Sequence, residues 1–96
     1  MIPEIDLHKY IRDKKKACAI IDMFIDEMAS KGHLTARIVH GKGKGDFRKM
    51  IHSHLSKHEL VEGFMLCDPL HGGDGATFVY LKRKTRDSNQ FLGKAD

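Results

Sequence analysis

The stretch "IVHGKGKGDFRKMIHSHL", residues 38–55, indicates how this chain folds. A short apolar run ends in His40, three glycines then alternate with two lysines, and Asp46 opens a segment with apolar residues at helical spacing. The apolar positions that share one face of this segment are Phe47, Met50, Ile51 and Leu55. We therefore predict a strand over 34–40, a glycine loop, and a helix over 46–57, as in one β-α unit of a layered sheet.

The flanking sequence predicts further elements of the same kind. Before the stretch, residues 4–8 alternate apolar with polar side chains as a strand does, and residues 13–31 carry an apolar stripe at helical spacing. After it, residues 61–67 and 76–84 alternate as strands, with turn-forming residues at 68–75 between them. The order β-α-β-α-β-β predicts an α/β fold: a two-layer sandwich of two helices on a mixed four-stranded sheet, with parallel crossovers and a final hairpin.

The length of 96 residues allows one domain. We expect residues 1–84 to form it and the polar residues 85–96 to be a flexible tail. No apolar run is long enough to span a bilayer, and the N-terminus lacks the layout of a signal peptide, so we expect no membrane partner. Cys18 and Cys67 lie apart in apolar stretches, which is typical of free thiols in a reducing compartment, and we expect a cytoplasmic location.

The glycine loop is predicted to bind phosphate. A net charge of +4 and a pI of about 9.2 favour anionic partners. Glycines let the main chain approach an anion closely, and the N–H groups that open the following helix point at it. The candidate binding residues are Gly41, Lys42, Gly43, Lys44, Gly45 and Lys49. The alternative interpretation is a tight turn with solvated lysines.

Neither common nucleotide motif is present in this loop. The chain has no G-x-x-x-x-G-K-[ST] sequence, and Asp46 stands where a dinucleotide fingerprint needs its third glycine. The extended phosphate backbone of a polynucleotide is therefore a better candidate ligand than a nucleotide cofactor.

Asp6 and His8 are two residues apart on the first predicted strand, so their side chains should share one face. If that strand lies beside the second, His40 and the glycine loop are close. With Arg48, this set would suit phosphodiester cleavage: a histidine moves the proton, the carboxylate orients it, and Arg48 stabilises negative charge growing on phosphorus. We take Asp6, His8, His40 and Arg48 as catalytic candidates. Alternatively, Asp6 caps a loop or pairs with a lysine, and His8 is an ordinary strand-end histidine.

Three segments together resemble a known family. They are "IDLH" at 5–8, the stretch at 38–55, and "GGDGATFVYLK" at 72–82. In this order and spacing they are similar to the small MutS-related (Smr) domain, whose pattern is LDLHG, a long helix, H/T-G-x-G, a second helix and a G-x-G-A/V-T-x-V-x-L strand. The resemblance covers about residues 4–83. It is strongest to the version that ends bacterial MutS-like recombination-suppressing ATPases, where the glycine motif runs into an arginine-bearing helix.

The resemblance implies DNA or RNA binding and, in many members of the family, endonucleolytic nicking. The family's acid and histidine fall on Asp6 and His8, its H-G-x-G motif on residues 40–43, and its basic helix position on Arg48. Lys9 stands where the family usually has a glycine after the histidine. Some members bind without cutting.

Three functions stay open at this point. The chain is an endonuclease acting on branched, flapped or single-stranded DNA or on RNA, a non-catalytic nucleic-acid-binding module, or a small protein-interaction domain. We predict no metal site held by the protein alone, but a divalent cation (Mg²⁺ or Mn²⁺) recruited with the nucleic acid is left open, since Asp6 can help to hold one. Membership of a larger multidomain protein is left open as well.

Overall fold

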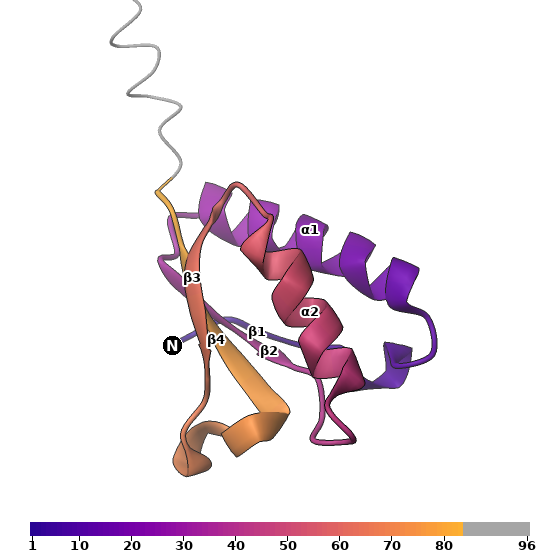
Figure 1. The fold of residues 1–96 in the computed structure, drawn as a ribbon. Coiled ribbons are helices and arrows are strands. Elements are labelled where there is room, and N and C mark those ends of the chain that lie inside the picture. Colours follow the sequence, from indigo (N-terminus) through magenta and orange to yellow (C-terminus); the bar gives the residue numbers. More distant parts are fainter. Residues whose placement is uncertain (84–96) are drawn as a thin grey trace, which may run out of the picture.

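The structure is a computed structural model that describes residues 1–83, so the tail predicted at 85–96 lies outside the described residues. Within them, strands and helices follow one another in the predicted order (Figure 1). The main elements are β1 (Glu4–Asp6), α1 (Lys14–Ser30), β2 (Thr35–Val39), α2 (Asp46–Ser56), β3 (Val61–Leu66) and β4 (Ala76–Leu81). Three short 3-10 turns accompany them: η1 (His8–Tyr10), η2 (Pro69–His71) and η3 (Gly73–Gly75).

The sheet is mixed and has the strand order β1-β2-β4-β3. β1 pairs with β2 in parallel, whereas β4 pairs antiparallel with both β2 and β3. β2 and β3 therefore run in the same direction with β4 between them, and α2 makes a crossover that skips one strand position. The predicted α/β class, the four-stranded mixed sheet and the final hairpin are confirmed.

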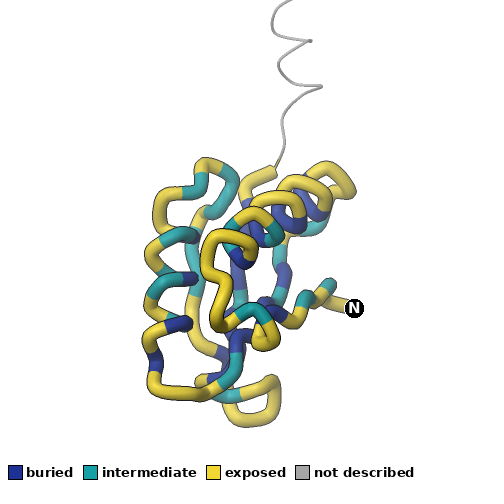
Figure 2. Tube along the Cα trace, turned by 90° about the vertical axis from the view of Figure 1, so that its right-hand side faces the viewer, coloured by how far each residue is buried: buried dark blue, intermediate teal, exposed yellow. Residues whose placement is uncertain are grey.

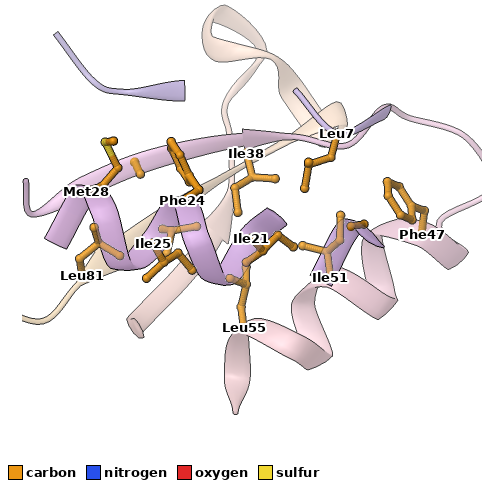
Figure 3. Packing of buried hydrophobic residues seen from close by; sticks show 13 residues of the cluster. Leu7, Ile21, Phe24, Ile25, Met28, Ile38, Phe47, Ile51, Leu55 and Leu81 are labelled. Carbon is orange, nitrogen blue, oxygen red and sulfur yellow. The ribbon is translucent and has the colours of Figure 1, made fainter. Parts of the chain in front are cut away.

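The two helices cover one face of this sheet, and the core lies between the two layers (Figure 2). On β2, Ala36 and Ile38 are fully buried against the helices, while Arg37 between them lies on the open face. The buried cluster comprises Leu7, Ala17, Ile21, Phe24, Ile25, Met28, Ala36, Ile38, Phe47, Ile51, Leu55, Val79 and Leu81 (Figure 3). This packing fixes the ends of β1 and β2, where the candidate site residues begin.

The ends of α1 follow the expected sequence signals. The Asp13 side chain accepts a hydrogen bond from the Lys16 backbone N–H at 3.1 Å, which caps the helix N-terminus. Gly32, one residue beyond the C-cap, has a φ of 87°, the left-handed conformation that ends helices.

The first strand is shorter than predicted. It ends at Asp6, and His8 opens the η1 turn instead of continuing the strand. Leu7 is the cause: its side chain is fully buried in the core, and its backbone N–H donates to the Val39 carbonyl at 2.7 Å. The chain then bends away from the sheet, so the predicted strand over 4–8 is wrong in its last two residues.

Candidate functional site

The glycine loop between β2 and α2 depends on its glycines for its shape. Gly41, Gly43 and Gly45 have φ values of 91°, 37° and 94°, in a region that residues with a Cβ rarely adopt. Gly45 is the N-cap of α2 and has no side chain to occupy the N–H groups of the first turn. Those groups therefore face the loop, where they can bind an anion.

A hollow of about 690 Å³ lies along this loop. Its lining consists of His8, Ile11, Lys14, His40, Gly41, Lys42, Gly43, Lys44, Gly45, Asp46, Phe47 and Arg48. Lys49 and Asp6 are outside the lining, although Asp6 contacts the lining residue His8. Lys14 was not assigned to the site from the sequence; the cluster of three lysines at 14–16 was its only signal.

The cations of the loop are not neutralised by the part of the protein that the structure describes. Within residues 1–83, no carboxylate forms an ion pair with Lys42, Lys44 or Arg48. The Arg48 guanidinium lies over Gly45, where a Cβ would come within 3.0 Å of Nη2. The arginine therefore reaches back from α2 to the loop, beside the free N–H groups of the helix.

The start of the loop is held by the turn before β4. The backbone N–H groups of His40 and Gly41 both donate to the Gly75 carbonyl, at 3.0 and 2.9 Å. A Cβ on Gly75 would come within 3.1 Å of Lys42 Cγ and 3.5 Å of the Gly41 carbonyl carbon. Gly75 thus holds the start of the loop through its carbonyl and, because it lacks a Cβ, leaves space for Gly41 and Lys42. This role was not foreseen from the sequence, which showed "GGDG" only as turn chemistry.

Asp6 and His8 are joined by two hydrogen bonds. His8 Nδ1 lies 2.6 Å from Asp6 Oδ1, and the His8 backbone N–H donates to the same oxygen at 3.0 Å. These bonds hold the pKa of the Asp6 carboxyl below its usual range, so it stays ionised at neutral pH. Both side chains remain about half exposed or more, at 65% for His8 and 52% for Asp6.

The His8 member of this pair lies directly against the glycine loop. A Cβ on Gly41 would come within 3.4 Å of the His8 Cβ, so glycine at this position allows the histidine to approach the loop backbone. With Asp6 holding Nδ1–H, the outward Nε2 of His8 is left as a proton acceptor. The arrangement therefore puts a proton acceptor beside a loop that is suited to an anion.

His40 occupies a different environment, because it is buried with only 1% of its surface exposed. Its Nδ1 lies 3.0 Å from the Gly41 carbonyl and its Nε2 lies 2.8 Å from Thr77 Oγ1. A carbonyl only accepts, so Nδ1 carries the proton and Nε2 accepts from the Thr77 hydroxyl. Both ring nitrogens of His40 are thus used inside the protein.

His52 completes this buried chain of hydrogen bonds. Its Nε2 lies 2.8 Å from Thr77 Oγ1, and because the hydroxyl proton goes to His40, His52 is the donor. Burial lowers the pKa of both His40 and His52, which keeps the rings neutral as this pattern requires. The chain links α2, β4 and the loop, and neither Thr77 nor His52 was predicted to belong to it.

No metal centre is built into the part of the chain that the structure describes. There, no three His, Cys, Asp or Glu side chains converge where they could hold an ion. His54 on α2 and His58, two residues beyond the end of that helix, both face one carboxylate oxygen of Asp22 on α1, at 2.8 and 3.4 Å. In residues 1–83, neither α1 nor α2 is both long enough and apolar enough to cross a membrane.

Comparison with known proteins identifies relatives of this chain. A model of the Smr domain family matches residues 5–82. Endonuclease MutS2 of Thermomicrobium roseum is 36% identical over 83 residues, which make up 84% of this chain and 10% of that protein. Endonuclease MutS2 of Clostridium botulinum (strain Eklund 17B) is 43% identical over 72 residues, 73% of this chain and 9% of that protein. The chain spans about a tenth of the length of these relatives.

Two solved structures share the fold. The Smr domain of Thermus thermophilus MutS2 superposes with a TM-score of 0.79 at 33% identity, covering 84% of this chain and 99% of that one. YdaL, a stand-alone small MutS-related protein from Escherichia coli, superposes with a TM-score of 0.71 at 26% identity, covering 83% of this chain and 64% of that one.

Proposed function

This chain belongs to the Smr domain family, and from that premise we propose that it binds nucleic acid and nicks it as a structure-selective endonuclease. The observation that carries the proposal is the Asp6–His8 pair, with 2.6 Å between Oδ1 and Nδ1, placed against the glycine loop. The relatives named endonucleases support it.

In the proposed reaction, His8 is the general base. Its Nε2 takes the proton from a water molecule that attacks phosphorus, while Asp6 keeps Nδ1 protonated and stabilises the imidazolium that forms. The bond from phosphorus to the leaving sugar oxygen breaks, that oxygen takes a proton from solvent water, and the His8 imidazolium returns its proton to solvent. Asp6 suits this part because the lowered pKa of its carboxyl keeps it charged while His8 changes its own charge.

The loop and Arg48 are proposed to bind the phosphate on which this chemistry occurs. The free N–H groups at the start of α2 supply fixed donors, while Lys42 and Lys44 supply mobile charge. Arg48 can donate two hydrogen bonds to phosphate oxygens and stabilise the charge that grows in the transition state. We place Lys49 among the outer phosphate contacts, since it is exposed beyond the hollow.

For His40 we propose positioning of the loop instead of direct catalysis. Its ring nitrogens are used by Gly41 and Thr77, and burial holds its pKa below the usual value. By holding the Gly41 carbonyl, it keeps the loop backbone next to His8.

The proposal extends to the setting of this domain. The relatives carry the matching region as about a tenth of a longer protein, which supports a multidomain context for this chain. Branched or single-stranded DNA, or RNA, are the proposed substrates, in repair or recombination. The two free cysteines, Cys18 and Cys67, support a reducing cytoplasmic location.

The proposal is tested by incubating the chain with supercoiled plasmid and with a structured RNA, each with and without EDTA. We expect wild type to cut one of the two. His8→Ala should cut at least about 100-fold more slowly while still binding, because it removes only the proton acceptor. Arg48→Ala should weaken both binding and cutting. The EDTA arm tests whether Mg²⁺ or Mn²⁺ enters with the phosphates.

The matched control is His33→Ala. His33 lies before the start of β2, whereas the glycine loop follows the end of β2, so the two are at opposite ends of the strand. It should cut as wild type does. If wild type binds both substrates with a steep salt dependence but cuts neither, the chain is a non-catalytic binding module and the roles of Asp6 and His8 are wrong. If no salt-sensitive binding is found, a protein-interaction domain becomes the better explanation.

A further inference from the structure

A second hollow lies on the face of the sheet that the helices leave open. It measures about 230 Å³ and is lined by Ile2, Arg37, His71 and Phe78. Arg37 on β2 and Phe78 on β4 are register partners, which places them side by side on this face. The proposed cleavage reaction uses none of these residues. The hollow therefore needs an explanation of its own.

We propose that Phe78, His71 and Arg37 form a stacking subsite for one unpaired nucleobase next to the phosphate that is cut. The inference rests on the proposed function and deepens it, because it names the kind of substrate. Single-stranded nucleic acids are bound by stacking their bases on aromatic rings and on guanidinium planes, and these are the groups that line the hollow.

The rings of His71 and Phe78 pack against each other and form one aromatic surface. The ring centroids of His71 and Phe78 are 5.7 Å apart, and their planes are tilted by 54°. Phe78 is only half-buried, although the strand neighbours on either side, Thr77 and Val79, are fully buried. One face of the hollow is thus an aromatic surface that the protein itself does not cover.

The polar groups of the subsite are held in place before any ligand arrives. His71 Nδ1 lies 2.6 Å from Asp68 Oδ1, a bond that also lowers the pKa of the Asp68 carboxyl. Arg37 donates through Nη1 to the His71 carbonyl at 2.6 Å and forms an ion pair with Glu4. Because these contacts fix both side chains, little side-chain entropy is lost when a base stacks on them.

The subsite lies close to Asp6 on the same face of the sheet. Glu4 pairs in register with Arg37, and Asp6, two residues further along β1, pairs with Val39. Residues two apart on a strand are about 6.6 Å apart, so the Arg37 side of the subsite is one row of side chains from Asp6, the carboxylate that holds the proposed general base.

The turn that carries His71 also connects the subsite to the glycine loop. This turn continues through η3 to Gly75, whose carbonyl accepts from the backbone of His40 and Gly41. Figure 1 shows both loops at the same end of the sheet, one on each side of β4. A phosphate site and a base site at one sheet end suit a strand that has left its duplex, because a paired base cannot enter the hollow.

The test compares two oligonucleotides of equal length and phosphate number, one with bases and one with abasic positions throughout, in an equilibrium binding assay. Wild type should bind the strand with bases more tightly. Phe78→Ala should bind that strand about tenfold more weakly and the abasic strand unchanged. Lys42→Ala should weaken both equally, because it removes only a phosphate contact.

A second readout reports the stacking itself. A strand that carries one 2-aminopurine should lose fluorescence when it binds wild type and keep it with Phe78→Ala. If circular dichroism shows that Phe78→Ala does not fold, Phe78→Leu replaces it in both measurements, since leucine keeps an apolar side chain but has no ring to stack on. Tyr80→Ala is the matched control, since Tyr80 lies two residues further along the same face of β4, outside the hollow, and should behave as wild type.

The outcomes separate this inference from the proposed function. If Phe78→Ala and Phe78→Leu bind both strands as wild type does, the stacking subsite is wrong and Phe78 only fills the open face. If wild type prefers neither strand but binds both with a steep salt dependence, the subsite is wrong while phosphate binding stands. If wild type binds neither strand, the stacking subsite is wrong, and the plasmid and structured-RNA assay decides the proposed function separately.

Discussion

At the scale of single residues, Thr77 joins the sheet to the glycine loop. Its hydroxyl accepts from His52 and donates to His40, at 2.8 Å in each case. Thr77 and His40 are buried, so the Nε2 of His40 has no water to replace the Thr77 hydroxyl if that hydrogen bond is lost. The threonine of the final strand motif thus has a physical role, because it keeps two histidines satisfied inside the protein.

Thr77→Val tests this role, because valine keeps the side-chain shape but removes both hydrogen bonds. We expect the free energy of unfolding to fall by about 1–3 kcal/mol in urea titrations, the usual cost of leaving buried polar groups unpaired. Thr35→Val is the control, since Thr35 lies on the open face of β2 and is only half-buried. Equal losses in the two variants would show that the hydrogen-bond chain adds no stability.

At the scale of elements, α2 begins at a glycine. A side chain at Gly45 meets two obstacles, the φ of 94° and the Arg48 guanidinium 3.0 Å from the position of a Cβ. The usual capping residues, Ser, Thr, Asp and Asn, would add a side-chain oxygen that occupies the N–H groups of the first turn. Glycine at position 45 leaves the N–H groups of the first turn free to bind a ligand and leaves space for the Arg48 guanidinium.

Gly45→Ala is therefore expected to act on both stability and binding. The left-handed backbone should cost about 1–2 kcal/mol of unfolding free energy, measured by urea titration. The displaced Arg48 should weaken binding of a short DNA or RNA strand. Gly63→Ala in β3 is the control, because a Cβ there has nothing within 4 Å and its φ is ordinary. If Gly45→Ala binds and unfolds as Gly63→Ala does, this account of the helix start is wrong.

At the scale of the whole molecule, stability should depend on pH through the buried histidines. Burial, with a smaller effect of the Arg48 charge, lowers the pKa of His40 and His52 from the usual 6.5. Above pH 6.5 both rings are mainly neutral in the folded and the unfolded chain. As the pH falls below that value the unfolded chain takes up protons first, so the folded state loses stability.

We expect the free energy of unfolding, measured in urea at pH 7.5, 6.5 and 5.5, to fall with each step. His52→Gln should reduce the slope, and His33→Gln should leave it unchanged. The lowered pKa of Asp6 and Asp68 acts in another range, because stability from these carboxylates is lost only as the pH falls below about 3.8. A slope that is the same in His52→Gln as in wild type would contradict this origin of the pH dependence.

The helices, the strands and the glycine-rich character of the loop could be predicted from local sequence patterns. Apolar residues at helical spacing predict the two helices, and alternating apolar and polar residues predict the strands. The glycines at 41, 43 and 45 indicate a backbone conformation that only glycine adopts readily. These signals are local, because each depends on residues within one or two turns of the chain. The spacing of Asp6 and His8 predicted that they share one face of a strand. Their side chains do contact each other, but His8 lies in the η1 turn and not on a strand.

The strand order and the neighbours of His40 could not be predicted in this way, because they depend on contacts between distant parts of the chain. Placing β4 between β2 and β3 depends on pairing between segments far apart in sequence, which no local period encodes. The same strand brings Gly75, Thr77 and Phe78 to the loop, to the buried histidines and to the open face. Whether a histidine faces a ligand or the core depends on what packs against it, and for His40 that is β4.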